Sequence, residues 1–173
     1  MKFSLSVAVG NYDRTRALVD GRVRIDGVNP AFMTLSPEEM FFRAFRHADF
    51  DITELSLASY AVSLANDANE YTALPIFLSR AFRHSSIYVT HESGIQKPEQ
   101  MRGKRIGIAE YQLTANVWAR ALLEDDYGVS PSEIVWVRGG MDAPVRPEKL
   151  RLDLPSDVRV EAVRPGETLN LLL

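Results

Sequence analysis

Short alternating runs and helically spaced apolar residues follow one another along the first half of the chain. Residues Phe3–Val9 alternate apolar and polar positions, which is typical of a half-buried strand. A short helix is expected over 14–20, with Gly21 as its end. A second strand is predicted at 23–25 and extended by 32–35, with turns at Asp26-Gly27 and Asn29-Pro30.

The next helix has a clear start. Ser36 can cap it, Pro37 suits the first helical position, and Glu39 completes a capping box. We expect a short strand at 51–55 and a second helix after it. The apolar stripes predicted to face the core are Met40, Phe41, Ala44 and Phe45 in the first helix, and Leu57, Tyr60, Ala61, Leu64 and Ala65 in the second.

The second half repeats this alternation. The predicted elements are a helical turn over 96–101, strands at 106–109, 134–137 and 158–163, and helices over 114–126 and 167–173. Gly128 should end the long helix, and Val117, Trp118, Ala121 and Leu122 should face inward. Alternating strands and helices predict α/β architecture with mostly parallel sheets. We expect two lobes, residues 1–88 and 89–173, joined near 85–95.

Composition narrows the function classes. A chain of 173 residues with 46% hydrophobic and 25% charged residues has an ordinary globular composition. The net charge of −3 gives no reason to expect nucleic acid or an anionic membrane as a partner, and no apolar run predicts membrane insertion. The absence of cysteine excludes thiolate nucleophiles and cysteine-ligated zinc. The three histidines, His47, His84 and His91, have no metal-ligand spacing, so neither a metal nor a cofactor is expected.

The two ends of the sequence suggest where in the cell the protein is located and that its parent protein is longer. Met1 and Lys2 lead directly into the first strand, without the longer apolar region of an export signal. We therefore expect a cytoplasmic protein, or a periplasmic one if a leader was trimmed away. The last predicted helix stops within two turns and ends on the apolar residues 171–173. The chain is therefore expected to be a truncated piece of a longer protein.

Three cationic side chains are concentrated in the segment Tyr71–Thr90. Arg80, Arg83 and His84 lie between an apolar run at 74–78, expected to be buried, and a strand-like run at 87–89. Charges cannot be buried there unpaired, so the three either form a solvated turn or line a cleft that receives an anion. Arginine suits carboxylates, and histidine exchanges protons near neutral pH. The pattern alone leaves both interpretations open.

A second set of candidates comes from the positions that follow the predicted strands. Ligands of open α/β sheets bind at the carboxyl ends of strands, beside helix N-termini. This rule selects Asn11, Tyr12, Asp13, Glu54, Ser56, Glu110, Tyr111, Gln112 and Thr114. Taken singly, Ser56 and Thr114 are better explained as helix caps, Tyr12 as packing and Glu54 as the partner of an arginine. Their agreement with one rule favours a site, and the loop over 80–84 is expected where the two lobes meet.

Several sequence blocks resemble a known family. The blocks LPIFLSRAFRHSSIYV, GKRIGIAEYQLTANVWARALLEDDYGV, IVWVRGG and RPEKL are similar to those of 4,5-dihydroxyphthalate decarboxylases. The segment MDAPVRPEKL keeps the family's Arg146, Glu148 and Lys149, whereas Val145 and Pro147 depart from its pattern. The resemblance implies a fold like that of type II periplasmic solute-binding proteins, with the C-terminal part of the family fold missing here.

The resemblance also implies a function, and two alternatives share the scaffold. The first is a carboxy-lyase that converts a dihydroxylated aromatic dicarboxylate to a dihydroxybenzoate by ring protonation in a cleft between the lobes. His84 is then the expected proton donor, with Glu54 second, and Arg80 and Arg83 hold the remaining carboxylate. Further substrate contacts are expected from Tyr12, Ser56, Tyr111 and Thr114.

The alternative is a receptor of an ABC-type uptake transporter that binds a small organic anion without reaction. The missing export signal favours the enzyme, because such a receptor must be exported. In both cases the expected partner is a small anionic aromatic ligand, and assembly into a homo-oligomer stays open.

Overall fold

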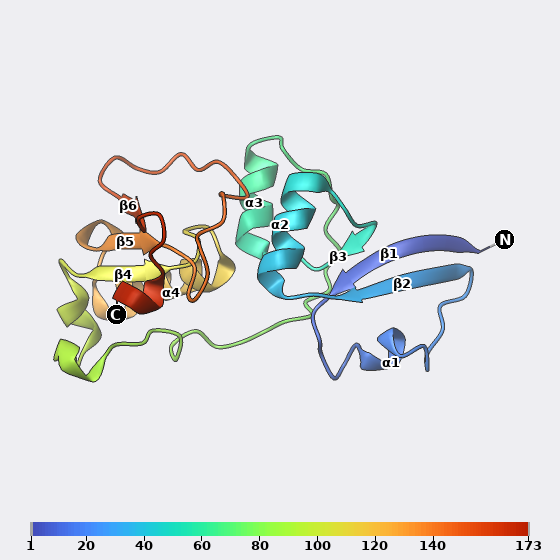
Figure 1. Cartoon of the computed structure of the whole chain (residues 1–173), viewed down its shortest axis with the longest axis horizontal. Coiled ribbons are helices and arrows are strands. Elements are labelled where there is room, and N and C mark those ends of the chain that lie inside the picture. Colours follow the sequence, from blue (N-terminus) through green and yellow to red (C-terminus); the bar gives the residue numbers. More distant parts are fainter. Residues whose placement is uncertain (1, 173) are drawn as a thin grey trace. The chain divides into compact units, whose positions relative to one another are not determined.

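The computed structural model describes residues 2–172 and divides the chain into two compact units, residues 1–80 and 81–173 (Figure 1). Each unit contains a three-stranded sheet in which all strand pairs are parallel. The predicted α/β architecture is therefore confirmed. Met1, the expected native start, and Leu173, the end of the last predicted helix, lie outside the described residues.

The first unit is built around β1, the central strand of its sheet. The sheet has the order β2-β1-β3, with Phe3 opposite Val28 and Val7 opposite Ile52. Its elements are β1 (Phe3–Val9), α1 (Arg16–Val19), β2 (Val28–Thr34), α2 (Pro37–His47), β3 (Ile52–Thr53) and α3 (Leu57–Ala65). Val7, Ala8 and Val9, at the carboxyl end of β1, are buried.

The predicted strand at 23–25 is wrong, and so is the turn at Asn29-Pro30. Residues 23–25 form no strand, and Pro30 lies inside β2, opposite Leu5. Proline is tolerated there because β2 is an edge strand, where a residue without an N–H need not break a ladder on both sides. The turn at Asp26-Gly27 is confirmed, since Gly27 has a φ of 77°.

Helix α2 begins as its sequence predicts. The Ser36 hydroxyl accepts a hydrogen bond from the Glu39 backbone N–H at 3.3 Å, and Pro37 is the first helical residue. Met40 and Ala44 are almost fully buried and pack with Ala8 and Phe50 to form the core of this unit.

Helix α3 buries a different face from the predicted one. Leu57 is 56% and Leu64 49% exposed, whereas Ser59 and Ser63 are fully buried. A serine can be buried at low cost when its hydroxyl bonds to the backbone of its own helix, as Ser63 does to the Tyr60 carbonyl at 2.8 Å. The apolar stripe is therefore the outer face of α3 within this unit.

The second unit repeats the parallel arrangement with the strand order β4-β5-β6. Ile106 lies opposite Trp136 and Trp136 opposite Val160. Its elements are η1 (His91–Ser93), η2 (Pro98–Met101), β4 (Arg105–Ile108), α4 (Thr114–Tyr127), η3 (Pro131–Glu133), β5 (Val135–Arg138), β6 (Arg159–Ala162) and α5 (Leu169–Leu172). Gly128 ends α4 with a φ of 64°, as predicted.

The predicted burial of the apolar run at 74–78 is wrong, and so is the predicted strand at 87–89. Residues 71–90 contain no helix or strand, so the strand-like run at 87–89 does not pair. Leu74, Ile76, Phe77, Tyr88 and Phe82 are all more than half exposed, Phe82 at 94%. Apolar residues form a buried strand only where a neighbouring strand offers an edge, and neither described sheet includes this segment.

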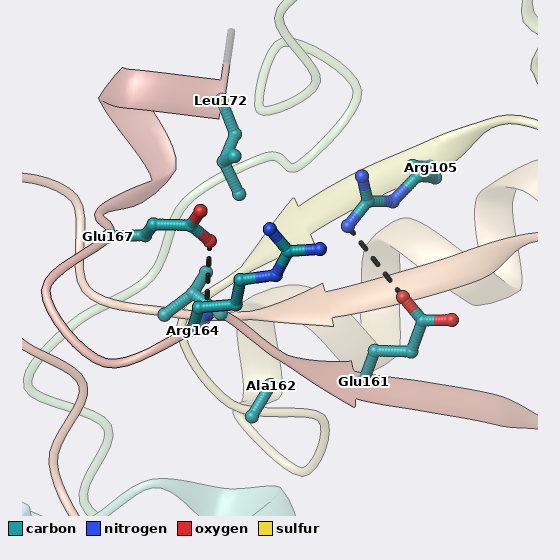
Figure 2. Close-up of a pocket in the computed structure, with 7 residues that line it drawn as sticks. Arg105, Glu161, Ala162, Arg164, Glu167 and Leu172 are labelled. Atoms are coloured by element: carbon teal, nitrogen blue, oxygen red, sulfur yellow. Dashed lines mark hydrogen bonds and ion pairs between the residues drawn. The ribbon is translucent and has the colours of Figure 1, made fainter.

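The end of β6 and the short helix α5 enclose a hollow of about 250 Å³. Figure 2 shows Arg164 extending across it, with the Arg105–Glu161 ion pair at 3.7 Å on one side. Glu167 accepts a hydrogen bond from the Arg164 backbone N–H at 3.1 Å. The residues that line this hollow therefore carry charges of both signs.

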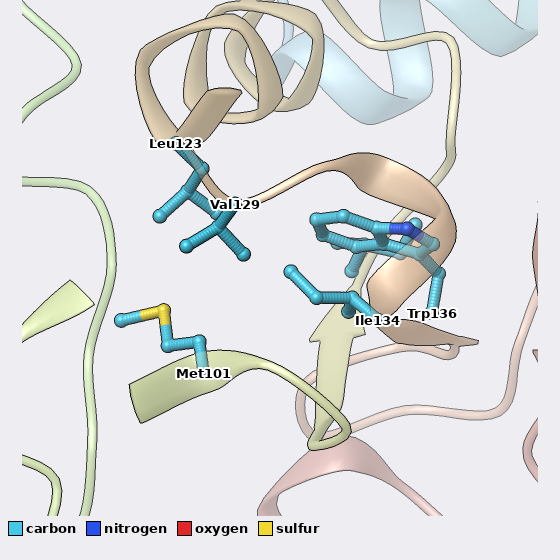
Figure 3. Packing of buried hydrophobic residues seen from close by; sticks show 6 residues of the cluster. Met101, Leu123, Val129, Ile134 and Trp136 are labelled. Atoms are coloured by element: carbon cyan, nitrogen blue, oxygen red, sulfur yellow. The ribbon is translucent and has the colours of Figure 1, made fainter. Parts of the chain in front are cut away.

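The core of the second unit lies between α4 and the sheet. Figure 3 shows Met101, Leu123, Val129, Ile134 and Trp136 converging on one another. Within α4 the buried positions are Arg120 and Leu123, so the predicted inward positions Val117 and Trp118 are wrong: they are 37% and 54% exposed. The buried face of α4 therefore carries a charged residue, Arg120, together with Leu123.

Among residues 2–172, no helix combines the length and apolarity that crossing a membrane requires. The cytoplasmic location expected from the sequence stays a prediction.

Two substitutions in α4 test which face is buried. Leu123→Ala should lower the free energy of unfolding by about 2–5 kcal/mol, because it leaves a cavity in the core. Trp118→Ala should cost about 1 kcal/mol or less, because the side chain is half exposed. Urea unfolding followed by far-ultraviolet circular dichroism measures both. A larger cost for Trp118→Ala than for Leu123→Ala would contradict the structure.

Candidate functional site

In the first unit, a polar cluster lies where β1 and β3 end. Glu54 follows β3, and its carboxylate accepts a hydrogen bond from the Tyr12 hydroxyl at 2.8 Å and from the Gly10 backbone N–H at 3.3 Å. Tyr12 and Gly10 both follow β1. The structure thus brings together two of the residues that the carboxyl-end rule selected, Tyr12 and Glu54.

The Tyr12 ring is packed against the Arg14 guanidinium. The Arg14 guanidinium lies 4.4 Å from the ring centroid, and Arg14 Nε donates to the Leu78 carbonyl at 2.6 Å. Burial raises the pKa of Tyr12, and the hydrogen bond to the Glu54 carboxylate raises that pKa further. Tyr12 therefore keeps its proton as a donor beyond the range of an ordinary tyrosine.

Glycine at position 10 makes room for this tyrosine. A Cβ placed on Gly10 would lie 2.6 Å from Tyr12 Cζ, closer than van der Waals contact allows. The ring thus approaches the backbone at the end of β1 so closely that a side chain there would displace it.

The other candidates of the first unit have structural partners. Ser56 is buried and caps α3, accepting from the Ser59 N–H at 3.4 Å, as the cap explanation predicted. Asn11 accepts from Arg16 Nη2 at 2.9 Å. Asp13 is exposed and accepts from the Arg14 backbone N–H at 2.8 Å.

A second polar cluster lies at the carboxyl end of β4. The Glu110 carboxylate forms an ion pair with Lys149, whose side chain is 3% exposed, and accepts from Gln112 Nε2 at 3.4 Å. The Glu110 carbonyl accepts from Asn116 Nδ2 at 2.6 Å. Glu110 and Gln112 were selected by the rule, whereas Lys149 was not given a role.

Tyr111 belongs to the same turn and packs inward. The Arg120 guanidinium lies 3.6 Å from its ring centroid and donates to its carbonyl at 2.7 Å, while the Trp136 ring lies edge-on at 6.0 Å. Burial raises the pKa of Tyr111, which the nearby Arg120 charge opposes. Thr114 is the first residue of α4 and the cap position is Leu113, so the explanation of Thr114 as the cap is wrong.

The cationic segment is divided between the units. Arg80 ends the first unit, with its guanidinium 5.3 Å from the Phe77 ring centroid. Arg83 and His84 begin the second unit, where His84 Nε2 lies 3.1 Å from an Asp126 carboxylate oxygen. Both partners of that pair are about half exposed, and among the described residues none of the three cations lines the hollow of Figure 2.

Residues 2–172 contain no group of three or more His, Asp or Glu side chains placed to hold a metal ion. The two clusters instead offer hydroxyl, amide, carboxylate and ammonium groups. These groups can bind the carboxylates and hydroxyls of a polar ligand and can transfer protons.

No family model matches the chain. The chain is 57% identical over 172 residues to a 4,5-dihydroxyphthalate decarboxylase of Pseudomonas putida. The matched residues make up 99% of this chain and 67% of that protein. The chain belongs to the 4,5-dihydroxyphthalate decarboxylase family. A protein of the same name from Comamonas testosteroni is 58% identical over 172 residues.

The family proteins are longer than this chain. The matched region is 99% of this chain but 52% of the Comamonas protein and 67% of the Pseudomonas protein. The chain thus spans about half to two thirds of the length of these decarboxylases.

Two residues that hold the second cluster of this decarboxylase-family chain together, Arg120 and Lys149, were given no role from the sequence. Arg120 was hidden within an apolar helical pattern, and nothing in its spacing indicated contact with Tyr111. Lys149 carried a usable signal, because it lies in the RPEKL block that resembles the family. Its contact with Glu110 joins two residues too far apart in sequence for a spacing rule to pair them.

The Tyr12–Glu54 hydrogen bond predicts a measurable titration. Glu54→Gln should lower the pKa of Tyr12 toward the ordinary tyrosine value, because it removes both the carboxylate acceptor and its charge. Tyrosinate absorbance, taken as the difference between each protein and its Tyr12→Phe variant, measures this pKa. An unchanged pKa in Glu54→Gln would show that the hydrogen bond does not form.

The same shift sets the sign of a pH effect on stability. Tyr12 is protonated in both states below the ordinary tyrosine pKa, where its stabilising contribution is fully present. The contribution is lost as the pH rises through the raised pKa of the folded protein, because the unfolded chain ionises first. This alkaline loss should be smaller in Glu54→Gln and absent in Tyr12→Phe.

Proposed function

We propose that the protein carrying this chain decarboxylates 4,5-dihydroxyphthalate to a dihydroxybenzoate. The single observation that supports this proposal is the 57–58% identity to two proteins named 4,5-dihydroxyphthalate decarboxylase, over 99% of the chain. Neither relative is named as a transport receptor, so the receptor alternative receives no support from them.

The reaction calls for groups of the kind these clusters contain. A ring hydroxyl para to the departing carboxylate, once deprotonated, pushes electrons toward the ring carbon that bears this carboxylate. An acid donates a proton to that carbon and forms a C–H bond. The bond to the carboxylate then breaks, its electron pair restores the aromatic ring, and carbon dioxide leaves. General acid catalysis of such a step contributes about 10²–10⁴-fold.

His84 is the proposed proton donor, and Glu54 is the second candidate. The contact of His84 Nε2 with Asp126 favours one ring orientation, as a carboxylate partner does in other acid–base sites. Glu54 sits in the polar cluster with Tyr12. Arg80 and Arg83 are proposed to bind the carboxylate that stays, and Tyr12, Ser56, Tyr111 and Thr114 to contact the substrate.

We also propose that the two units belong to a fold of the type II periplasmic-binding-protein kind. The two parallel three-stranded sheets, with polar clusters at the carboxyl ends of β1 and β4, are compatible with it. A crystal structure of the full-length Pseudomonas relative would test the assignment directly.

Release of carbon dioxide from 4,5-dihydroxyphthalate tests the activity. The protein carrying this chain should produce equal amounts of carbon dioxide and dihydroxybenzoate. The Pseudomonas relative, at full length and trimmed to its 172 matched residues, is the matched control. Activity only in the full-length relative would show that the missing part is needed. Tight binding without turnover by a full-length protein would contradict the proposed reaction.

The proton donor can be assigned by comparing two variants in an active full-length background. His84→Gln should abolish turnover while the dissociation constant for 4,5-dihydroxyphthalate stays close to that of the wild type, because glutamine keeps the polar volume but cannot donate the required proton. Asp126→Asn, which keeps the size of the partner, should reduce turnover less. A near-normal rate in His84→Gln together with a lost rate in Glu54→Gln would transfer the role to Glu54.

A further inference from the structure

Two consecutive residues, Glu148 and Lys149, attach an irregular segment of the chain to the ends of two strands. Residues 139–158 contain no helix or strand, yet Glu148 and Lys149 both form ion pairs there. Glu148 pairs at 3.2 Å with Arg138, the last residue of β5, and Lys149 pairs with Glu110 beyond the end of β4. Arg138 Nη1 also donates to the Arg146 carbonyl at 2.8 Å. The segment is therefore held at the carboxyl ends of neighbouring strands.

The two ion pairs differ in burial. In the first pair Glu148 is 40% exposed and Arg138 14%, so one of its two charges keeps much of its contact with water. Lys149 is 3% and Glu110 13% exposed, so both charges of that pair have lost most of their water. Apolar residues of similar volume often stabilise a fold as well as such a pair does. What the charged pair adds is a fixed geometry for the atoms around it.

The geometry fixed here is that of the turn between β4 and α4. Lys149 holds the Glu110 carboxylate, Asn116 holds the Glu110 carbonyl at 2.6 Å, and Arg120 holds the Tyr111 carbonyl at 2.7 Å. Arg120 also stacks on the Tyr111 ring at 3.6 Å. Three side chains from two different segments thus fix two consecutive residues at the strand end where ligands of parallel sheets bind.

We propose that Lys149 is a positioning residue: through the buried pair with Glu110 it fixes the turn after β4, where the aromatic dicarboxylate binds. This inference rests on the proposed decarboxylase function. It assigns to Lys149 a role in substrate affinity, not in the proton transfer. A misplacement of about 1 Å at a binding turn can lower catalytic efficiency by about 10²-fold.

The test separates positioning from folding. Lys149→Met leaves the Glu110 carboxylate buried without its ammonium partner and should destabilise the fold. In the double variant Glu110→Gln/Lys149→Met no charge remains buried, so the free energy of unfolding should recover. If Lys149 positions the turn, KM for 4,5-dihydroxyphthalate stays raised about 10- to 100-fold in the double variant, with a smaller change in kcat.

Arg151→Met is the matched control from the same segment. Arg151 is 91% exposed and lies 3.8 Å from the equally exposed Asp153, so its loss should leave both KM and stability unchanged. A KM in the double variant within about twofold of the wild-type value would overturn the proposal and leave the pair a purely structural one. If Lys149→Met does not fold, the double variant decides the question alone.

The outcomes for the two proposals are distinct. A full-length wild-type protein that neither binds nor converts the substrate removes the proposed function, and this inference with it. A wild-type protein that is active while the double variant keeps its KM removes the inference alone. Where the wild type binds without turnover, the dissociation constant replaces KM in the comparison.

Discussion

Parallel strand pairing is the constraint on which both units depend. It brings the carboxyl ends of neighbouring strands to one edge of a sheet, where the chain leaves the ladder and its polar groups need new partners. In the first unit these partners are Tyr12 and Glu54, which join the ends of β1 and β3. In the second, Lys149 meets Glu110 beyond the end of β4. The same requirement that completes the fold thus concentrates polar chemistry at one edge of each sheet.

Local signals in the sequence predicted the elements well. The alternation of Phe3–Val9, the serine cap before Pro37 and the glycine after α4 each act over a few residues, and each is found where expected. The faces of helices were harder to predict. In α3 the buried side chains are serines, and the Ser63 hydroxyl donates to the carbonyl of Tyr60 in the same helix. In α4 an arginine lies on the inner stripe because aromatic rings receive its guanidinium. A pattern of hydrophobic residues alone does not reveal the contacts that allow these polar side chains to be buried.

The candidate site residues also divide into those that a local signal finds and those that depend on distant segments. The rule about strand ends found Tyr12, Glu54 and Glu110, because the rule depends only on where a strand stops. It could not find Lys149, whose position depends on how residues 139–158 fold back to the sheet. The cationic segment, chosen for its composition, lies among residues without regular structure, and most of its flanking apolar residues are exposed. Composition indicates chemistry, but burial is decided by pairing with distant segments.

The serine face of α3 has a practical consequence for anyone who modifies this protein. Surface-engineering schemes usually keep leucines and replace serines, since leucines are assumed to be internal. In this helix the assumption is reversed: Leu57 and Leu64 are accessible to exchange for polar residues, whereas a bulkier group at Ser59 or Ser63 would have no space. Solubility variants and attachment points for labels are therefore best chosen on the leucine face.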